Sequence, residues 1–142
     1  MPTLIDATGT EHNIVQPPSR IISLVPSTTH SVCILGKRKQ LVGITNFCNR
    51  PNSIRSRIEK VGGTKNVSIE KVIRLQPDIV LANKEENTKE DIETLRKHNI
   101  PVFVAFPQTL EQALIDLIDL GRILDATHRA QKLVEEIQNS SF

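Results

Sequence analysis

The sequence predicts an α/β domain with a mainly parallel sheet flanked by helices. Three short segments, residues 21–25, 78–82 and 102–105, are apolar without polar alternation, as expected of strands buried on both faces. Helical patterns separate these segments, and parallel strands need such crossover connections. A chain of 142 residues, 38% hydrophobic and 24% charged, is long enough for one domain with a buried core.

Turn and capping residues set the ends of the expected elements. Thr8-Gly9-Thr10 joins two short strands into a β-ribbon, Gly36 ends the first helix, and Ser68 and Thr109 each cap a later helix. In the first half of the chain we expect strands at 3–5, 12–15, 21–25 and 41–44, with a helix at 28–35 between the last two, and then a loop at 46–51 and a turn at 61–63. In the second half we expect a helix after Ser68 that ends before Pro77, a strand at 78–82, a helix at 88–98 and a strand at 102–105. A helix after Thr109, with Gln112 completing a capping box, and a last helix at 126–139 follow.

Helical spacing also predicts which side chains face the core. The last helix follows its predecessor with almost no linker and leads to no further strand, so we expect it to pack against, or continue into, something outside this chain. The inward residues are Ile69, Val72, Ile73 and Leu75; Ile92 and Leu95; Leu114, Leu117, Ile118 and Gly121; and Ala130, Leu133, Val134 and Ile137.

Composition argues against several functions. The net charge is +2 and there are four Phe and no Trp or Tyr, which does not favour a nucleic-acid partner. No apolar run approaches the ~20 residues of a membrane span. The first residues lack the basic and apolar regions of a signal peptide, so we expect either a cytosolic protein or one whose signal was removed.

The strongest functional signal is the passage from the strand at 21–25 into the next helix. Ser27, Thr28 and Thr29 follow Pro26, so hydroxyls and free backbone N–H groups are expected at the carboxyl edge of the sheet. Such groups bind carboxylate, phosphate or amide oxygens. Simple capping of the helix is the competing interpretation. Thr64 and Asn83 follow later turns and strands and are expected at the same edge.

Several segments, in order, resemble the iron-siderophore, haem and cobalamin substrate-binding proteins of ABC transporters. Each motif alone is weak evidence for this family, but the motifs follow one another in the family's order along residues 5–138, and this order makes the resemblance specific. The matching segments are 6–9, 17–29, 41–45 with Cys48 and Pro51, 61–63 with 68–72, 75–82 and 100–102.

The resemblance implies a fold and a role. Members have two Rossmann-like lobes joined by a long helix, with the ligand between the lobes. Residues 1–125 would then be the N-terminal lobe and residues 126–142 the start of the inter-lobe helix, with the second lobe absent. The implied function is non-catalytic capture of a ferric siderophore, haem or cobalamin and delivery to an ABC permease, in the periplasm or at the outer face of the cytoplasmic membrane.

Individual residues inherit roles from the resemblance. Ser27, Thr28, Thr29, Phe47, Thr64 and Asn83 would contact ligand, with Phe47 matching an aromatic that stacks on flat macrocycles. Glu70 falls where members place the acid that docks on the permease, and an acid near a helix start is electrostatically favourable. His30, where members often carry Glu, and Cys48 are weak metal-ligand candidates, because two ligands do not complete a site.

Two other functions remain open from the residues. The sheet could serve a nucleotide-binding or enzymatic module, although the Gly-x-Ser-x-Gly, P-loop and Gly-x-Gly-x-x-Gly motifs are all missing. The chain could also be a cytosolic scaffold that binds a second lobe or copy through its C-terminal helix. With no catalytic constellation and no intrinsic cofactor expected, the binding protein is the interpretation we carry forward.

Overall fold

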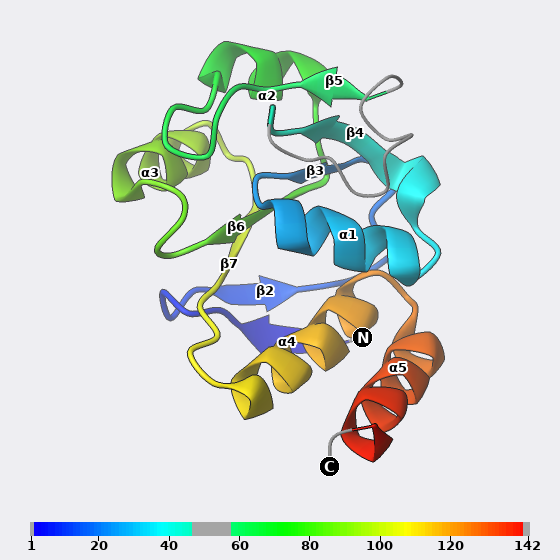
Figure 1. The fold of residues 1–142 in the computed structure, drawn as a ribbon. Coiled ribbons are helices and arrows are strands. Elements are labelled where there is room, and N and C mark those ends of the chain that lie inside the picture. The colour runs from blue at the N-terminus through cyan, green and yellow to red at the C-terminus, as the bar shows by residue number, and fades with distance from the viewer. Residues whose placement is uncertain (1, 47–57, 141–142) are drawn as a thin grey trace.

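A five-stranded parallel sheet forms the centre of the protein, as a computed structural model describing residues 2–46 and 58–140 shows (Figure 1). Its strand order is β5-β4-β3-β6-β7, and every neighbouring pair is parallel. A separate antiparallel ribbon precedes it. The strands are β1 (Thr3–Ile5), β2 (Glu11–Asn13), β3 (Ile21–Ser23), β4 (Leu41–Ile44), β5 (Glu59–Lys60), β6 (Ile79–Asn83) and β7 (Val102–Ala105).

Helices cover both faces of the sheet and make three layers. On one face, Leu81 and Phe103 of the sheet pack with buried residues of α1, α4 and α5. On the other face, Val80 and Val102 pack with buried residues of α2 and α3, so the two apolar clusters lie on opposite sides of the strands. The helices are α1 (Pro26–Ile34), α2 (Ile69–Leu75), α3 (Lys89–Lys97), α4 (Leu110–Ile123) and α5 (Thr127–Asn139), with a short 3-10 turn at Arg38–Gln40.

The predicted α/β class and most predicted elements are confirmed, with several local corrections. β2 and β3 each end two residues earlier than predicted, at Asn13 and Ser23. α1 begins at Pro26, two residues earlier than predicted, because proline is well suited to the first helical position. The edge strand β5 was not predicted, since two charged residues carry no apolar signal. Ile73 is 38% exposed rather than inward, because the short α2 rests on its Val72 side. The Gln112 side chain accepts from the N–H of Gln108, not of Thr109.

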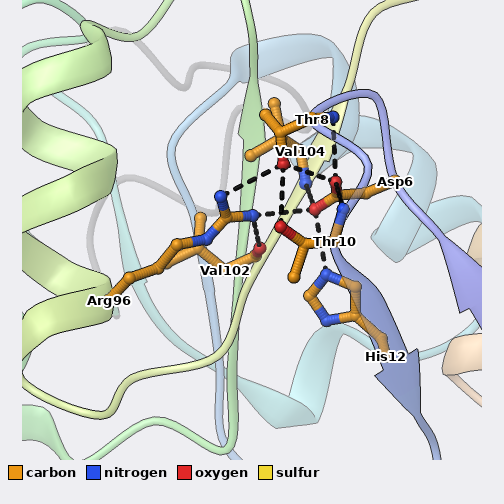
Figure 2. Close-up of polar contacts among 7 residues, drawn as sticks. All are labelled: Asp6, Thr8, Thr10, His12, Arg96, Val102 and Val104. Atoms are coloured by element: carbon orange, nitrogen blue, oxygen red, sulfur yellow. Dashed lines mark hydrogen bonds and ion pairs between the residues drawn. The ribbon is translucent and has the colours of Figure 1, made fainter.

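The β1–β2 ribbon is attached to the main body through the buried carboxylate of Asp6 (Figure 2). Inside the ribbon this carboxylate accepts hydrogen bonds from Thr8, Thr10 and His12 at 2.6–3.1 Å. From the body it accepts the Arg96 guanidinium of α3 at 2.8 Å and the Val104 N–H of β7 at 3.1 Å. One side chain therefore joins the ribbon, α3 and β7.

The contact between α4 and α5 depends on a glycine. An ideal Cβ on Gly121 would lie 2.5 Å from the Cβ of Ala130 and 3.1 Å from the carbonyl oxygen of Ala126. We therefore expect Gly121→Ala to push α5 away from α4 and to lower the free energy of unfolding by about 1–3 kcal/mol, measured by urea denaturation.

Its control is a double-mutant cycle with Ala130→Gly, which removes the methyl group that the new Cβ would meet. The double variant is expected to be destabilised by less than the sum of the single variants. Additivity within about 0.5 kcal/mol would show that the two positions do not clash and would contradict the prediction.

Candidate functional site

The candidate site lies at the carboxyl edge of the sheet and continues between α1 and α4, where its lining on α4 runs from Ala113 to Ile123. A cavity of about 230 Å³ opens there. Ser27 and Thr28 of α1, Asn83 at the end of β6 and Pro107 after β7 line it together with Asp116 of α4. Segments distant in the sequence therefore meet at one place, as parallel strands require of the loops at their carboxyl ends.

A larger cavity, of about 390 Å³, lies at the opposite edge of the sheet. Residues 11–18 and the starts of β6 and β7 line it. We place the candidate site at the carboxyl edge instead, because open α/β sheets bind ligands outside the carboxyl ends of their strands, where helix N-termini point.

The start of α1 leaves its backbone donors uncommitted to any capping side chain. Val25 occupies the N-cap position and makes no side-chain hydrogen bond, whereas Ser68, Thr88 and Thr109 each accept a backbone N–H at the starts of α2, α3 and α4. Ser27 is exposed and Thr28 is half-buried in the first turn of α1. Simple capping, the competing interpretation, does not describe these residues, because neither is the N-cap.

Thr29 differs from the two residues before it. It is completely buried, and its hydroxyl donates to the carbonyl of Val25 at 3.1 Å. Its side chain lies on the buried side of α1, and the predicted contact between Thr29 and a ligand stays a prediction.

A buried amide that sequence reasoning missed holds the edge loops together. Asn87 is 2% exposed, and its Nδ2 donates to the carbonyls of Leu24 at 3.2 Å and Thr64 at 3.0 Å, while its Oδ1 accepts the N–H of Asn83 at 2.8 Å. It thus connects the loops that follow β3, β5 and β6, and brings Thr64 near Asn83.

Asn83 itself is partly committed to its own loop. Its Oδ1 accepts the backbone N–H groups of Glu85 at 2.8 Å and Glu86 at 3.0 Å, an Asx turn that shapes the segment after β6. The Nδ2 donor is therefore the part of the Asn83 side chain left for a ligand.

Aromatic and cationic groups also gather beside this edge. The Lys84 ammonium lies 5.7 Å from the ring centre of Phe106, in the loop after β7. Lys65 donates to the carbonyl of Glu85, which ties the loop after β5 to the loop after β6. The residues that follow β5, β6 and β7 therefore contact one another.

Asp116 gives the cavity wall on α4 a carboxylate. Its Oδ2 is buried and has no hydrogen-bond partner among the residues that the structure describes. Burial, with a smaller contribution from the nearby charge of Asp119, raises the pKa of Asp116 to about 6. Its ionised form is therefore less favourable than that of a carboxylate in water.

We expect the stability of the protein to fall as the pH rises through the range between 3.8, the ordinary pKa of Asp116, and its folded value of about 6. The folded state holds the proton more tightly than the unfolded state across this range, so ionisation costs the folded state free energy. Asp116→Asn should therefore stabilise the protein at pH 7.5, by at most about 1 kcal/mol after solvent screening, and less at pH 4.5. Urea denaturation at both pH values measures this, and equal effects would contradict it.

The other predicted residues lie in different places. Glu70 is exposed in the first turn of α2, which Ser68 caps, and so belongs to the opposite face of the sheet from α1. His30 is exposed on α1. Phe47 and Cys48 lie outside the described residues, so their predicted roles stay predictions.

Within residues 2–46 and 58–140, no group of three or more His, Cys, Asp or Glu side chains is placed to hold a metal ion. In that same part of the chain no helix has both the length and the apolarity needed to cross a membrane.

Comparisons with known proteins point to one family of binding proteins. Curated vitamin B12-binding proteins from Photorhabdus laumondii subsp. laumondii and Vibrio parahaemolyticus are 29% and 26% identical to this chain over 127 and 123 residues. These matches cover 89% and 87% of this chain but only 46% and 44% of those relatives, so the chain spans about half their length.

Solved structures show the same fold. The periplasmic heme-binding protein of Pseudomonas aeruginosa superposes with a TM-score of 0.80 at 24% identity, over 86% of this chain and 44% of that one. The periplasmic vitamin B12-binding protein of Vibrio cholerae gives a TM-score of 0.79 at 24% identity, over 87% and 48%. The profile of the periplasmic binding proteins matches residues 21–141, and the chain therefore belongs to the periplasmic binding protein family.

Proposed function

We propose that this chain forms the N-terminal lobe of a periplasmic receptor that captures a macrocyclic metal chelate and delivers it to an ABC importer. The observation that carries the proposal is the shared cavity of Ser27, Thr28 and Asn83 at the carboxyl edge of the sheet. Family membership and the vitamin B12- and heme-binding relatives support the ligand class. On this proposal the role is binding without catalysis, outside the cytoplasmic membrane.

The binding chemistry follows from the groups at that edge. The hydroxyls of Ser27 and Thr28 and the N–H groups of the first α1 turn would meet acceptor oxygens at the ligand periphery. The Nδ2 of Asn83 and the hydroxyl of Thr64 would add contacts from neighbouring loops. Phe47 would supply a face for stacking on the flat ring, and His30 or Cys48 could reach the metal only with further ligands.

In this proposal α5 is the start of the helix that leads to a second lobe. α5 follows α4 after a turn at residues 124–126, where Asp125 has a φ of 57°. Of its predicted inward residues, Ala130 is fully buried in the core cluster that includes Leu120 and Ile123 of α4, whereas Leu133, Val134 and Ile137 are half-buried. A ligand held by this lobe alone would keep much of its surface in water, so we expect weak binding.

The test is titration of the ¹⁵N-labelled chain with cyanocobalamin, haem, a ferric siderophore and ATP, followed by amide chemical shifts. We expect a macrocycle to shift Ser27, Thr28 and Asn83, with dissociation constants that NMR can detect in the millimolar range or below. Shifts caused by ATP alone would favour the nucleotide-binding module. No shift with any probe would remove the proposed ligand class.

We further propose that Glu70 docks on a cationic residue of the importer. The carboxylate is exposed in the first turn of α2, where the helix dipole favours a negative charge. An exposed carboxylate at this position can form a charge-assisted hydrogen bond with a cation of a partner protein. Glu70→Lys is expected to weaken capture by detergent-solubilised permease by about tenfold, the cost of one such pair. Glu93→Lys, at an exposed glutamate of α3, is the matched control, and equal losses would contradict a specific role for Glu70.

A further inference from the structure

The larger cavity, of about 390 Å³, lies at the amino edge of the sheet, where the parallel strands begin, and the proposed function does not use it. Its volume falls in the range of small-molecule sites, roughly 300–1,000 Å³. The walls are largely apolar and come from the segment after β2, the starts of β6 and β7 and the end of α4. They include Ile14, Val15, Pro17, Ile79, Pro101 and Ile123. The apolar part of a small molecule can therefore leave water there.

His12 of β2 adds a polar ring to this wall. Its side chain is 8% exposed, and its Nε2 lies 2.9 Å from the Oδ2 of Asp6 (Figure 2). The ring also packs against Phe103, with 5.0 Å between the two ring centres. Neither Asp6 nor Phe103 lines the cavity, so both contacts hold the ring from behind. The orientation of His12 is thus fixed before any ligand enters.

The second ring nitrogen of His12, Nδ1, is left for a ligand. It makes no hydrogen bond within the part of the chain that the structure describes, and it keeps contact with solvent. Burial alone would raise the pKa of Asp6, but its hydrogen bonds outweigh burial and keep the carboxylate ionised at neutral pH. An ionised carboxylate only accepts, so Nε2 carries the hydrogen and the neutral ring presents a lone pair at Nδ1.

The charged side chains on the cavity wall are acidic. Glu11 and Asp78 line it, and none of the described residues that do so is a lysine or arginine. Burial alone would raise the pKa of Asp78, but hydrogen bonds from Arg20 and Ser19 outweigh it and lower the pKa, so the carboxyl is ionised at neutral pH. The Arg20 guanidinium donates to the carbonyl of Leu75 and does not line the cavity. A positive charge is therefore favoured there over a negative one.

We propose that the cavity at the amino edge is a second ligand site, which binds a small organic ammonium ion with an apolar body. The apolar body would lie against the proline and aliphatic walls. The ammonium group would donate a hydrogen bond to the Nδ1 of His12 in the field of Glu11 and Asp78. Because Asp6 and Phe103 already orient the imidazole, binding would order little of the protein. The site is separate from the candidate site at the carboxyl edge and does not depend on the proposed function.

Three fragments of nearly equal size and different charge test the site: benzylamine, benzyl alcohol and benzoate. Titration of the ¹⁵N-labelled chain at pH 7.5 follows the amides of Asn13, Val15 and Ile79, which line the cavity. We expect benzylamine to shift these amides with a dissociation constant in the millimolar range. Benzyl alcohol should bind about tenfold more weakly, the effect of one charge-assisted hydrogen bond, and benzoate should bind more weakly still.

His12→Gln tests the imidazole itself. The glutamine amide N–H can replace Nε2–H as the donor to Asp6, but the variant has no nitrogen at the position of Nδ1. We expect its affinity for benzylamine to fall by about tenfold, to that of benzyl alcohol. His98→Gln, at an exposed histidine that follows α3, is the matched control and should leave the affinity within about twofold.

A measurement on the wild-type chain keeps the test independent of how well His12→Gln folds. Long-range ¹H–¹⁵N spectra resolve the two ring nitrogens of a histidine, and benzylamine should shift the Nδ1 of His12 more than its Nε2. The inference is overturned if benzylamine leaves the cavity amides unshifted at millimolar concentration, if benzyl alcohol or benzoate binds as tightly as benzylamine, or if Nδ1 does not respond. Receptor function stands in each case, because its readout is at the amides of the carboxyl edge.

Discussion

Replacing Asp6 with alanine is expected to lower the free energy of unfolding by about 3–5 kcal/mol. The side chain of Asp6 is inaccessible to solvent and ionised, and it accepts hydrogen bonds from five residues (Figure 2). Alanine would remove the acceptor of His12 and of the Val104 N–H in a place that water reaches poorly, and it would leave the Arg96 guanidinium with only the Val102 carbonyl and the Thr8 hydroxyl. Urea denaturation at pH 7 measures the loss.

The pH dependence of this loss provides an internal control. Burial alone would raise the pKa of Asp6, but the hydrogen bonds from Thr8, His12 and Val104 outweigh it and hold the pKa below 3.8. The carboxylate therefore stabilises the fold above pH 3.8, and its contribution disappears as the pH falls through its lowered pKa. The difference between wild type and Asp6→Ala should shrink in acid.

Glu135→Ala is the matched substitution for the loss of charge, because Glu135 is exposed on α5. Its effect should stay within about 0.5 kcal/mol. A loss at Asp6 no larger than this at pH 7 would show that the ribbon contributes little to the stability of the main body, contrary to the expectation.

The sequence was sufficient to predict the fold, because the features that determine it are local. A parallel strand buried on both faces must be apolar along its length, and β4 and β7 begin and end where such runs do. The caps of α2 and α4 are also local, since Ser68 and Thr109 bond to N–H groups three residues away. β5 was not predicted, because a two-residue edge strand needs neither an apolar run nor a capping residue.

The candidate site was only partly predictable, because its organisation depends on contacts between distant residues. Parallel topology was enough to bring Ser27 and Asn83 into one cavity. The inward turn of Thr29 follows from where α1 begins, which the Ser-Thr-Thr run does not reveal. Asn87 bonds to a carbonyl 63 residues away, and its only local signal is its position just before the Thr88 cap.

The surroundings of Asp116 also could not be predicted from the sequence, because they depend on residues that are distant along the chain. Its place in α4 follows from helical spacing, but the lack of a partner for its Oδ2 emerges only when α1, the end of β7 and α4 are packed together. Sequence analysis can nominate a carboxylate on a helix, and the assembled wall is needed to show that it lacks a partner.

Replacing Asn87 with alanine is expected to lower the free energy of unfolding by about 2–4 kcal/mol and to disorder the candidate site. The substitution removes three side-chain hydrogen bonds, one of them buried and two partly buried, and it takes this partner from the carbonyls of Leu24 and Thr64 and from the N–H of Asn83. Because these groups belong to three loops of the site, we expect binding of a macrocycle to weaken together with stability. Urea denaturation and the amide titration measure the two effects.

Two further variants test whether the loss of stability in Asn87→Ala comes from the hydrogen bonds of the Asn87 side-chain amide. Asn87→Asp keeps an acceptor for Asn83 but has no donors for the two carbonyls, so it should be at least as destabilising as alanine at pH 7. Asn139→Ala, at an exposed position near the end of α5, should change stability by less than about 0.5 kcal/mol.

Hydrogen exchange measures where in the protein the effect of Asn87→Ala lies. Under conditions where the protein stays folded, the Asn83 N–H, which loses its acceptor, should exchange faster in this variant. The amides of α5 should keep their protection. Unchanged exchange at Asn83, with macrocycle binding intact, would mean that the three loops hold their positions without Asn87.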